Sequence, residues 1–201
     1  MTLSPEMLHA DALRVLRAWT SPSPEQERLR DRYVAYLEQQ PDALVRECRP
    51  HHLTASMLVF DESRTRVLLT LHAKSGRWFQ LGGHAEPGDD TLAGAALREA
   101  LEESGLAVSD LRATPTPVLL DEHPVPFCGP GEGVHHLDVV FAGVARDGAG
   151  HRVSEESLDV AWWPVDDLPN PELVAFVAAA AQSTSEPGGG SSRAAADQPS
   201  R

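Results

Sequence analysis

Three glutamates in one segment carry the clearest chemical signal of the chain. Glu99, Glu102 and Glu103 are spaced i, i+3 and i+4, so on a helix they occupy one stripe about 100° wide. Like charges at this spacing destabilise an isolated helix by roughly a few tenths of a kcal/mol, and the helix dipole disfavours anions in the last turn. A cation bound by the carboxylate oxygens would remove this conflict, and Mg²⁺ or Mn²⁺ suits such ligands. The alternative interpretation is a solvated acidic face.

A glycine-rich stretch before this helix favours the metal-binding interpretation. Gly82, Gly83 and Gly88 predict a tight loop in which the backbone can approach a ligand closely. The N-terminus of the following helix adds amide donors, which suit phosphate oxygens. His84 lies in the same loop, where it would contact phosphate or cap the loop. Together, the loop and the acidic helix predict a joint site for a metal ion and a phosphate group.

The segment 82–106, GGHAEPGDDTLAGAALREALEESGL, resembles the Nudix box, G-x5-E-x7-R-E-U-x-E-E-x-G-U, in which U is aliphatic. Residues 98–106 match the second half at every fixed position, with Ala taken as U, and Gly83 matches the opening glycine. The first half departs from the pattern by one extra residue and by an Asp in place of the first Glu. This acid is Asp89 when counted from Gly83, and Asp90 when counted back from Arg98. In the family it mainly braces the loop, commonly through the box arginine.

The resemblance implies a reaction and a set of roles. Nudix enzymes cleave the diphosphate linkage of a nucleoside diphosphate joined to a group X, by attack of water on phosphorus. The implied catalytic residues are Arg98, Glu99, Glu102 and Glu103. The implied ligands of Mg²⁺ or Mn²⁺ are Glu99, Glu103, Glu102 and the carbonyl of Gly82 or Gly83. Glu102 would be a ligand or the base that activates water, and Arg98 would orient Glu99 and the loop.

Residues outside the helix are candidates for contacts with the substrate. Trp78 or Phe79 could stack on a base, but strand alternation puts them on opposite faces, so we expect one to lie in the core. Trp162 and Trp163 present the same ambiguity. Many Nudix enzymes use a further acid from outside the box. The candidates here are Glu155 and Glu156, with Glu122 and Glu132 as alternatives, and for each the competing interpretation is an ordinary surface acid.

The histidines and cysteines give weaker indications. His135, His136 and Asp138 lie on one predicted strand, with His123 upstream. Because His136 and Asp138 share a face while His135 points away, the pattern does not favour a zinc site. The two cysteines, Cys48 and Cys128, show no C-x-x-C spacing and are expected to be free thiols.

The surrounding pattern predicts an α+β fold, an α/β/α sandwich with a mixed sheet between helices. The predicted strands are 54–60, 66–71, 78–81, 118–120, 137–145 and 160–164, and the first two form a hairpin. The helix over 91–104 is capped at Asp89, Asp90 or Thr91 and stopped at Gly105. Its predicted buried face consists of Ala93, Leu97, Ala100 and Leu101. A closing helix is predicted over 171–181.

Three regions are expected along the chain. Residues 1–50 form an N-terminal helical extension that covers one side of the main domain, with Gln26 placed to close a capping box on Ser23 and a third short helix around Leu44 and Val45. Residues 51–181 form the Nudix domain. Residues 182–201 are rich in Gly, Ser, Pro and Ala and lack large apolar side chains, so a disordered tail is expected.

Charge and hydropathy exclude several classes of protein. The chain has 201 residues with 17 Lys and Arg against 30 Asp and Glu, a net charge of −13. Such an acidic chain is poorly suited to bind nucleic acid or an anionic membrane, because both require a basic surface. No apolar run approaches the ~18 residues of a membrane span, and residues 1–20 lack the apolar core of a secretory signal. We expect a cytoplasmic protein that acts on a small nucleotide, and a homodimer, since dimers are common in the family.

The sequence leaves two alternatives to a hydrolase open. The first is a catalytically inactive Nudix-fold module that binds a nucleotide, which would not need all three glutamates. The second is a Nudix-fold isopentenyl-diphosphate isomerase, which uses a cysteine early in the fold and matches the box poorly. Cys48 precedes the first strand and Cys128 follows the helix, so this second alternative fits poorly. Sugar nucleotides, dinucleotides, ADP-ribose, oxidised nucleoside triphosphates and coenzyme A all remain open as substrates.

Overall fold

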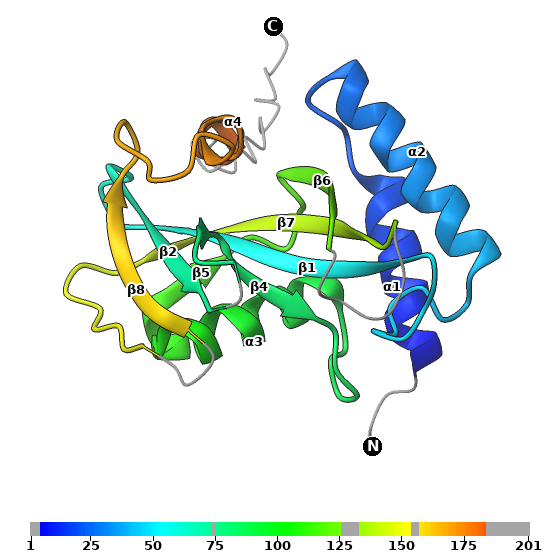
Figure 1. Ribbon diagram of the computed structural model, residues 1–201, viewed down its shortest axis with the longest axis horizontal. Coiled ribbons are helices and arrows are strands. Elements are labelled where there is room, and N and C mark those ends of the chain that lie inside the picture. Colours follow the sequence, from blue (N-terminus) through cyan, green and yellow to red (C-terminus); the bar gives the residue numbers. More distant parts are fainter. Residues whose placement is uncertain (1–4, 74, 126–132, 154–156, 184–201) are drawn as a thin grey trace, which may run out of the picture.

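The computed structural model describes residues 5–73, 75–125, 133–153 and 157–183, in which a mixed sheet lies between helices (Figure 1). The helices are α1 Pro5–Ala18, α2 Pro24–Gln39, α3 Leu92–Ser104 and α4 Leu173–Ser183. The strands are β1 His51–Phe60, β2 Arg66–His72, β3 Trp78–Phe79, β4 Leu81–His84, β5 Leu111–Ala113, β6 Leu119–Pro124, β7 His135–Ala145 and β8 Ser157–Pro164. Among the described helices, none has the length and apolarity needed to cross a membrane. The predicted fold class is confirmed.

Strand β1 lies at the centre of the sheet and pairs with β2, β4 and β7. It pairs in parallel with β7 along its whole length, from His51 opposite His135 to Phe60 opposite Val144. Its other edge is shared by two antiparallel partners: β4 pairs with the middle of β1, from Thr54 to Met57, and β2 pairs with its end. Strand β8 extends the sheet beyond β2, and β5 and β6 both pair with β7. Strand β4 therefore runs beside the sheet centre, next to α3.

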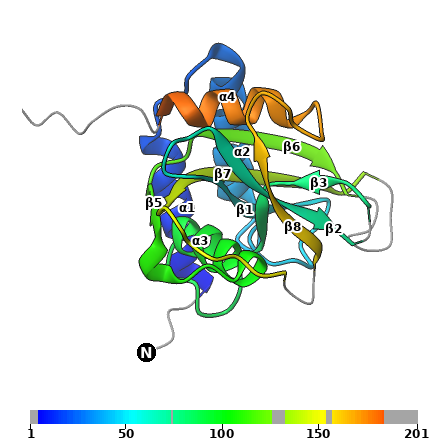
Figure 2. The same cartoon turned by 90° about the vertical axis from the view of Figure 1, so that its left-hand side faces the viewer.

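Each face of the sheet carries its own apolar layer. On one face, alternate residues of β1 from Leu53 to Val59 pack with α1 and α3. On the other face, Leu58 and Phe60 pack with α4, which Figure 2 shows lying across that side of the sheet. The first half of this second face is polar and buried instead, with His52, Thr54 and Ser56 in β1. The α4 layer therefore covers only part of its face, and the part nearest β4 is polar.

The hairpin between β1 and β2 forms as predicted. The carboxylate of Asp61 in the turn accepts hydrogen bonds from the backbone N–H groups of Thr65 at 2.8 Å and Arg66 at 2.9 Å. These bonds lower the pKa of the Asp61 carboxyl, although its burial acts in the opposite direction. Strand β5 was not predicted, because its three residues are too few to show a periodicity.

The N-terminal helices form, but their details differ from the prediction. Ser23 caps α2 by accepting a hydrogen bond from the Gln26 N–H at 3.2 Å. The Gln26 side chain instead binds the backbone of Leu120 in β6: its Nε2 donates to the carbonyl at 2.9 Å, and its Oε1 accepts from the N–H at 2.6 Å. The short helix predicted around Leu44 is wrong, since turns occupy 41–44. The two helices thus cover one end of the sheet beside β6 (Figure 1).

The C-terminal helix begins two residues later than predicted, at Leu173, and ends at Ser183. Of the predicted tail over 182–201, residues 184–201 lie outside the described part of the chain. The division of the chain into an extension, a domain and a tail stays a prediction.

Replacing Gln26 by Ala tests how α2 is held against the sheet. The change leaves the N–H and carbonyl of Leu120 without their partners, so we expect the free energy of unfolding to fall by about 1–3 kcal/mol. Urea denaturation measures the change. Gln39→Ala, at an exposed position of the same helix, is the control and should change the free energy by less than about 0.5 kcal/mol. Equal effects of the two changes would contradict this account.

Candidate active site

Helix α3 has well-defined ends that fix the position of its acidic residues. Thr91 is the N-cap, and its hydroxyl oxygen accepts a hydrogen bond from the Gly94 N–H at 3.0 Å. Gly105 ends the helix in the left-handed conformation, with φ of +65°, and its N–H donates to the Leu101 carbonyl. Both ends agree with the prediction, and Thr91 is the one of the three proposed caps that the helix uses.

The buried face of α3 differs from the prediction. Its buried residues are Leu92, Ala95, Ala96, Ala100 and Ser104. Of the predicted set only Ala100 is fully buried, while Ala93, Leu97 and Leu101 are half-buried at the edge of the core. The buried stripe is rotated because β4 packs beside α3, and Glu99 falls within that stripe. The Glu99 side chain is 13% exposed, whereas that of Glu102 is 58% exposed.

The two central glycines lie in strand β4 rather than in a loop, which corrects the prediction. Ala55 of β1 pairs with Gly83, and Ser56 pairs with Gly82. A Cβ on Gly83 would lie 2.7 Å from Oε1 of Glu99, and a Cβ on Gly82 would lie 2.3 Å from Cβ of Ser56. Only glycine lets β4 lie between the α3 acids on one side and β1 on the other.

Strand β4 also contacts Glu103 directly. The backbone N–H of Gly82 donates to Oε2 of Glu103 at 2.9 Å. In an antiparallel strand, a residue whose N–H points away from its partner strand has its carbonyl on the same side. The carbonyl of Gly82 therefore lies along the edge that faces the acidic helix. This placement agrees with the predicted grouping of Glu99, Glu103 and the Gly82 carbonyl.

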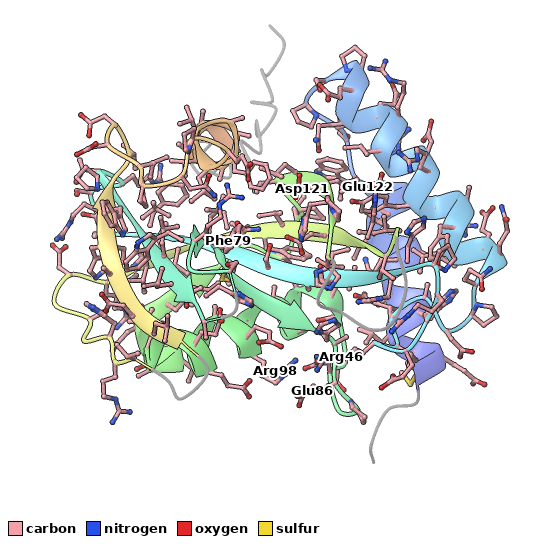
Figure 3. All side chains as sticks on the ribbon, viewed as in Figure 1. Arg46, Phe79, Glu86, Arg98, Asp121 and Glu122 are labelled. Atoms are coloured by element: carbon pink, nitrogen blue, oxygen red, sulfur yellow. The ribbon has the colours of Figure 1, made fainter. Side chains whose placement is uncertain are left out.

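Arg98 connects the acidic helix to the segment that precedes it. Its guanidinium makes two hydrogen bonds to Asp89, of 3.0 and 3.1 Å, and one to the carbonyl of His84 at 2.9 Å. It also pairs with Glu102 at 2.8 Å and with Glu99 at 3.2 Å. Burial opposes the charge, but the hydrogen bond to Asp89 and the nearby carboxylates raise the pKa of Arg98 above its usual value. Figure 3 shows Arg98 on the α3 side of the sheet.

Asp89, and not Asp90, occupies the position of the first acid of the box. The Asp89 side chain is 7% exposed, pairs with Arg98 and accepts a hydrogen bond from the Glu86 N–H at 2.8 Å. Asp90 is exposed. The extra residue of this segment therefore lies between Asp89 and Arg98.

The aromatic candidates take different places. Trp78 packs edge-on against Trp163, with ring centroids 5.3 Å apart, at the α4 layer. Trp162 lies at the α3 layer, with the guanidinium of Arg66 5.6 Å from its ring. Phe79 is half-buried and has the guanidinium of Arg77 5.6 Å from its ring. Phe79 is therefore the candidate that still suits stacking on a base.

Of the acids predicted outside the box, Glu122 is the one that the described residues include, and it does not join this group. Glu122 forms an ion pair with Arg32 of α2 at 2.7 Å and lies 3.0 Å from the His135 ring. Figure 3 shows Glu122 near α2, away from Arg98. The alternatives Glu132, Glu155 and Glu156 lie outside the described residues.

Sequence reasoning missed a polar cluster on the other face of the sheet. The buried carboxylate of Asp138 accepts hydrogen bonds from Thr54 at 2.9 Å, Ser56 at 2.5 Å and Gln80 at 3.2 Å. Burial raises the pKa of the Asp138 carboxyl. The signal that could have revealed this cluster is the polar alternation at 52, 54 and 56 within an otherwise apolar strand.

Comparisons with known proteins agree with this geometry. The family model described as NUDIX domain matches residues 50–182. The chain resembles the structure of a NUDIX-family hydrolase from Clostridium perfringens, with a TM-score of 0.51 and 22% identity, over 65% of this chain and 97% of that one.

It also resembles an Ap4A hydrolase from C. elegans, with a TM-score of 0.53 and 16% identity, over 66% of this chain and 96% of that one. A third similar structure is the NUDIX domain of Shewanella oneidensis NrtR in complex with ADP ribose, with a TM-score of 0.52 and 15% identity, over 70% and 92% of the two chains. No curated protein matches the sequence. At these identities, the structural matches show the shared fold.

Replacing Asp89 by Asn tests the ion pair that braces this segment. Asn keeps the size of the side chain but removes one of the two acceptors and the charge that face Arg98. We expect the free energy of unfolding to fall by about 1.5–3 kcal/mol, the usual cost of losing hydrogen bonds to a charged group. Asp90→Asn, one residue away and exposed, should have little effect. A larger loss for Asp90→Asn in thermal or urea unfolding would reverse the assignment.

Replacing Gly82 by Ala tests the close approach of β4 to β1. The new Cβ would meet Ser56, and the strand would have to move away at a cost of about 1–3 kcal/mol. Because Gly82 also donates to Glu103, activity should fall along with stability. Gly150→Ala is the control, since no atom lies within 4 Å of its Cβ position. Unchanged stability and activity in Gly82→Ala would show that the approach is not required.

Proposed function

Because the chain belongs to the Nudix family and is a hydrolase that acts on phosphoanhydride bonds, we propose that it cleaves the diphosphate linkage of a nucleoside diphosphate joined to a group X. In this proposal water attacks one phosphorus, and two phosphate-bearing fragments leave. The observation that supports it most directly is the grouping of Glu99 and Glu103 against the glycine strand β4.

The same grouping supports binding of Mg²⁺ or Mn²⁺. Three carboxylates surround the guanidinium of Arg98, namely those of Asp89, Glu99 and Glu102. A fourth, that of Glu103, contacts β4 beside it. Bringing several carboxylates together in a half-buried place is costly, and a bound cation lowers that cost. The donors are all oxygen atoms, which suits a hard divalent cation. When bound, such a cation neutralises the bridging phosphates and lowers the pKa of bound water.

The exposure of the three box glutamates divides their roles. Glu99 and Glu103 face β4 and the Gly82 carbonyl, so they and that carbonyl are the proposed metal ligands. Glu102 points to solvent and is held by Arg98 at 2.8 Å. A carboxylate that is both positioned and open to water suits the role of general base. Arg98 acts as a positioning residue, because it binds Glu99, Glu102 and the carbonyl of His84 at once.

The similar solved structures suggest a class of substrate, which we propose here. One similar structure is named as an Ap4A hydrolase and another as a NUDIX domain in complex with ADP ribose. We propose a substrate of this kind, with adenosine or another nucleoside on one side of the diphosphate. Phe79 is the proposed contact for the base. The cytoplasmic location and the homodimer stay predictions of the sequence.

The first alternative, a binding module without catalysis, has one observation in its favour. The NrtR domain shares the fold and is named as a complex with ADP ribose. The full set of box glutamates favours the hydrolase. The second alternative, an isomerase, has no support at the acidic helix: the Cys48 sulfur lies 3.5 Å from the Tyr36 hydroxyl of α2. Cys128 lies outside the described residues.

A substrate panel with Glu103→Gln tests the proposed reaction. Gln preserves an oxygen that accepts the Gly82 N–H, so the fold should persist while the charge for the metal is lost. With Mg²⁺ or Mn²⁺, the wild type should cleave Ap4A, ADP-ribose or a sugar nucleotide, and kcat of the variant should be lower by about 10²–10⁴-fold. Phosphate and nucleotide release are the readouts.

The control for this experiment is Glu38→Gln, which removes a helical glutamate from an exposed ion pair with Arg17 and should retain full activity. A wild type that cleaves nothing, while one compound of the panel raises its Tm, would favour the binding module. Equal turnover by Glu103→Gln and the wild type would contradict the proposed site.

A further inference from the structure

Three histidines from three neighbouring strands come together on the face of the sheet opposite α3. They are His52 of β1, His84 of β4 and His136 of β7, and one ring nitrogen of each lies within 4.8 Å of the other two. The Nε2 atoms of His52 and His84 are 3.0 Å apart. The three pairs of ring centroids are separated by 4.8–5.0 Å.

The register of the sheet places these rings together. His52 pairs with His136 in the parallel ladder of β1 and β7. His84 pairs with Thr54, which is two residues from His52 and therefore on the same face of β1. Three backbone segments that are far apart in the sequence thus present one imidazole each to the same point.

The environment of the rings favours neutral imidazoles with a lone pair to donate. Burial lowers the pKa of both His52 and His136, and the neighbouring His84 ring lowers that of His136 further. Nε2 of His136 is buried and has no hydrogen-bond partner among the described residues.

We propose that His52, His84 and His136 bind a divalent transition-metal ion, with Zn²⁺ the best suited. Three imidazole nitrogens within 4.8 Å of one another are a ligand set that Zn²⁺ accepts, and they leave a fourth position for water or a further ligand. This site differs from the carboxylate group in its donor atoms and lies on the other face of the sheet. His84 links the two, because its carbonyl accepts from Arg98 while its ring faces the histidine site.

The other histidines and acids nearby have different partners. Asp138 is held by Thr54, Ser56 and Gln80, and His135 lies 3.0 Å from Glu122. His123 lies 2.6 Å from Asp121 and packs edge-on against His136. The sequence pattern of His123, His135, His136 and Asp138 did not favour a zinc site. Of these four residues only His136 belongs to the proposed site, and the other two ligands come from β1 and β4.

Zinc titration of the untagged full-length chain tests the proposal. The chelator-treated protein is titrated with Zn²⁺ against a chromophoric competitor, with Mg²⁺ in large excess so that hard oxygen sites are filled. We expect about one equivalent of tightly bound Zn²⁺ and a rise in Tm. His136→Ala and, separately, His84→Ala should weaken binding by more than about 100-fold, beyond the usual effect of losing an outer-shell partner.

The matched control is His135→Ala, which removes the adjacent histidine of the same strand and should bind Zn²⁺ as the wild type does. Circular dichroism of the metal-free variants shows whether they fold; if His136→Ala does not fold, the half-buried His84 is the deciding position. Tight zinc binding that survives in the folded triad variants, or a wild type that binds no zinc in the presence of Mg²⁺, overturns the proposal. The inference does not rest on the proposed function, which the substrate panel tests separately.

Discussion

One guanidinium surrounded by an excess of carboxylates is the constraint on which the site depends. Arg98 binds Asp89, Glu99, Glu102 and the carbonyl of His84, so it fixes α3 against the segment that leads into it. Because an arginine offers five donors in a planar fork, it can hold several acceptors in one geometry, which a lysine could not do. The concentration of negative charge around it is the physical basis of the proposed cation site.

Strand β4 connects Arg98 and the acidic helix to the sheet. Its two glycines let the backbone lie in contact with Glu99 on one side and Ser56 on the other. The next residue, His84, has its carbonyl bound to Arg98 and its ring among the histidines of β1 and β7. A four-residue strand thus connects an acidic, oxygen-rich group on one side of the sheet with a nitrogen-rich group on the other.

The fold and the acidic helix could be predicted from sequence because their signals are local. The spacing of Glu99, Glu102 and Glu103, the stop at Gly105 and the β1–β2 hairpin depend on residues close together in the chain. The failures concern long-range contacts. Gln26 binds Leu120 instead of closing its own cap, because an edge strand offers unpaired backbone groups. The buried stripe of α3 is set by β4, which no helical periodicity can reveal. The meeting of His52, His84 and His136 depends on strand register, which the sequence did not specify.

The central claim is that Glu99 and Glu103 hold a divalent cation against β4. Electron paramagnetic resonance of Mn²⁺ measures this directly, as the fraction of free Mn²⁺ in the presence of protein, with no need to know the substrate. The account predicts that the wild type binds Mn²⁺, that Mg²⁺ displaces it, and that Glu99→Gln lowers the affinity at least about tenfold. Mn²⁺ binding that is absent from the wild type, or equally strong in Glu99→Gln, would contradict it.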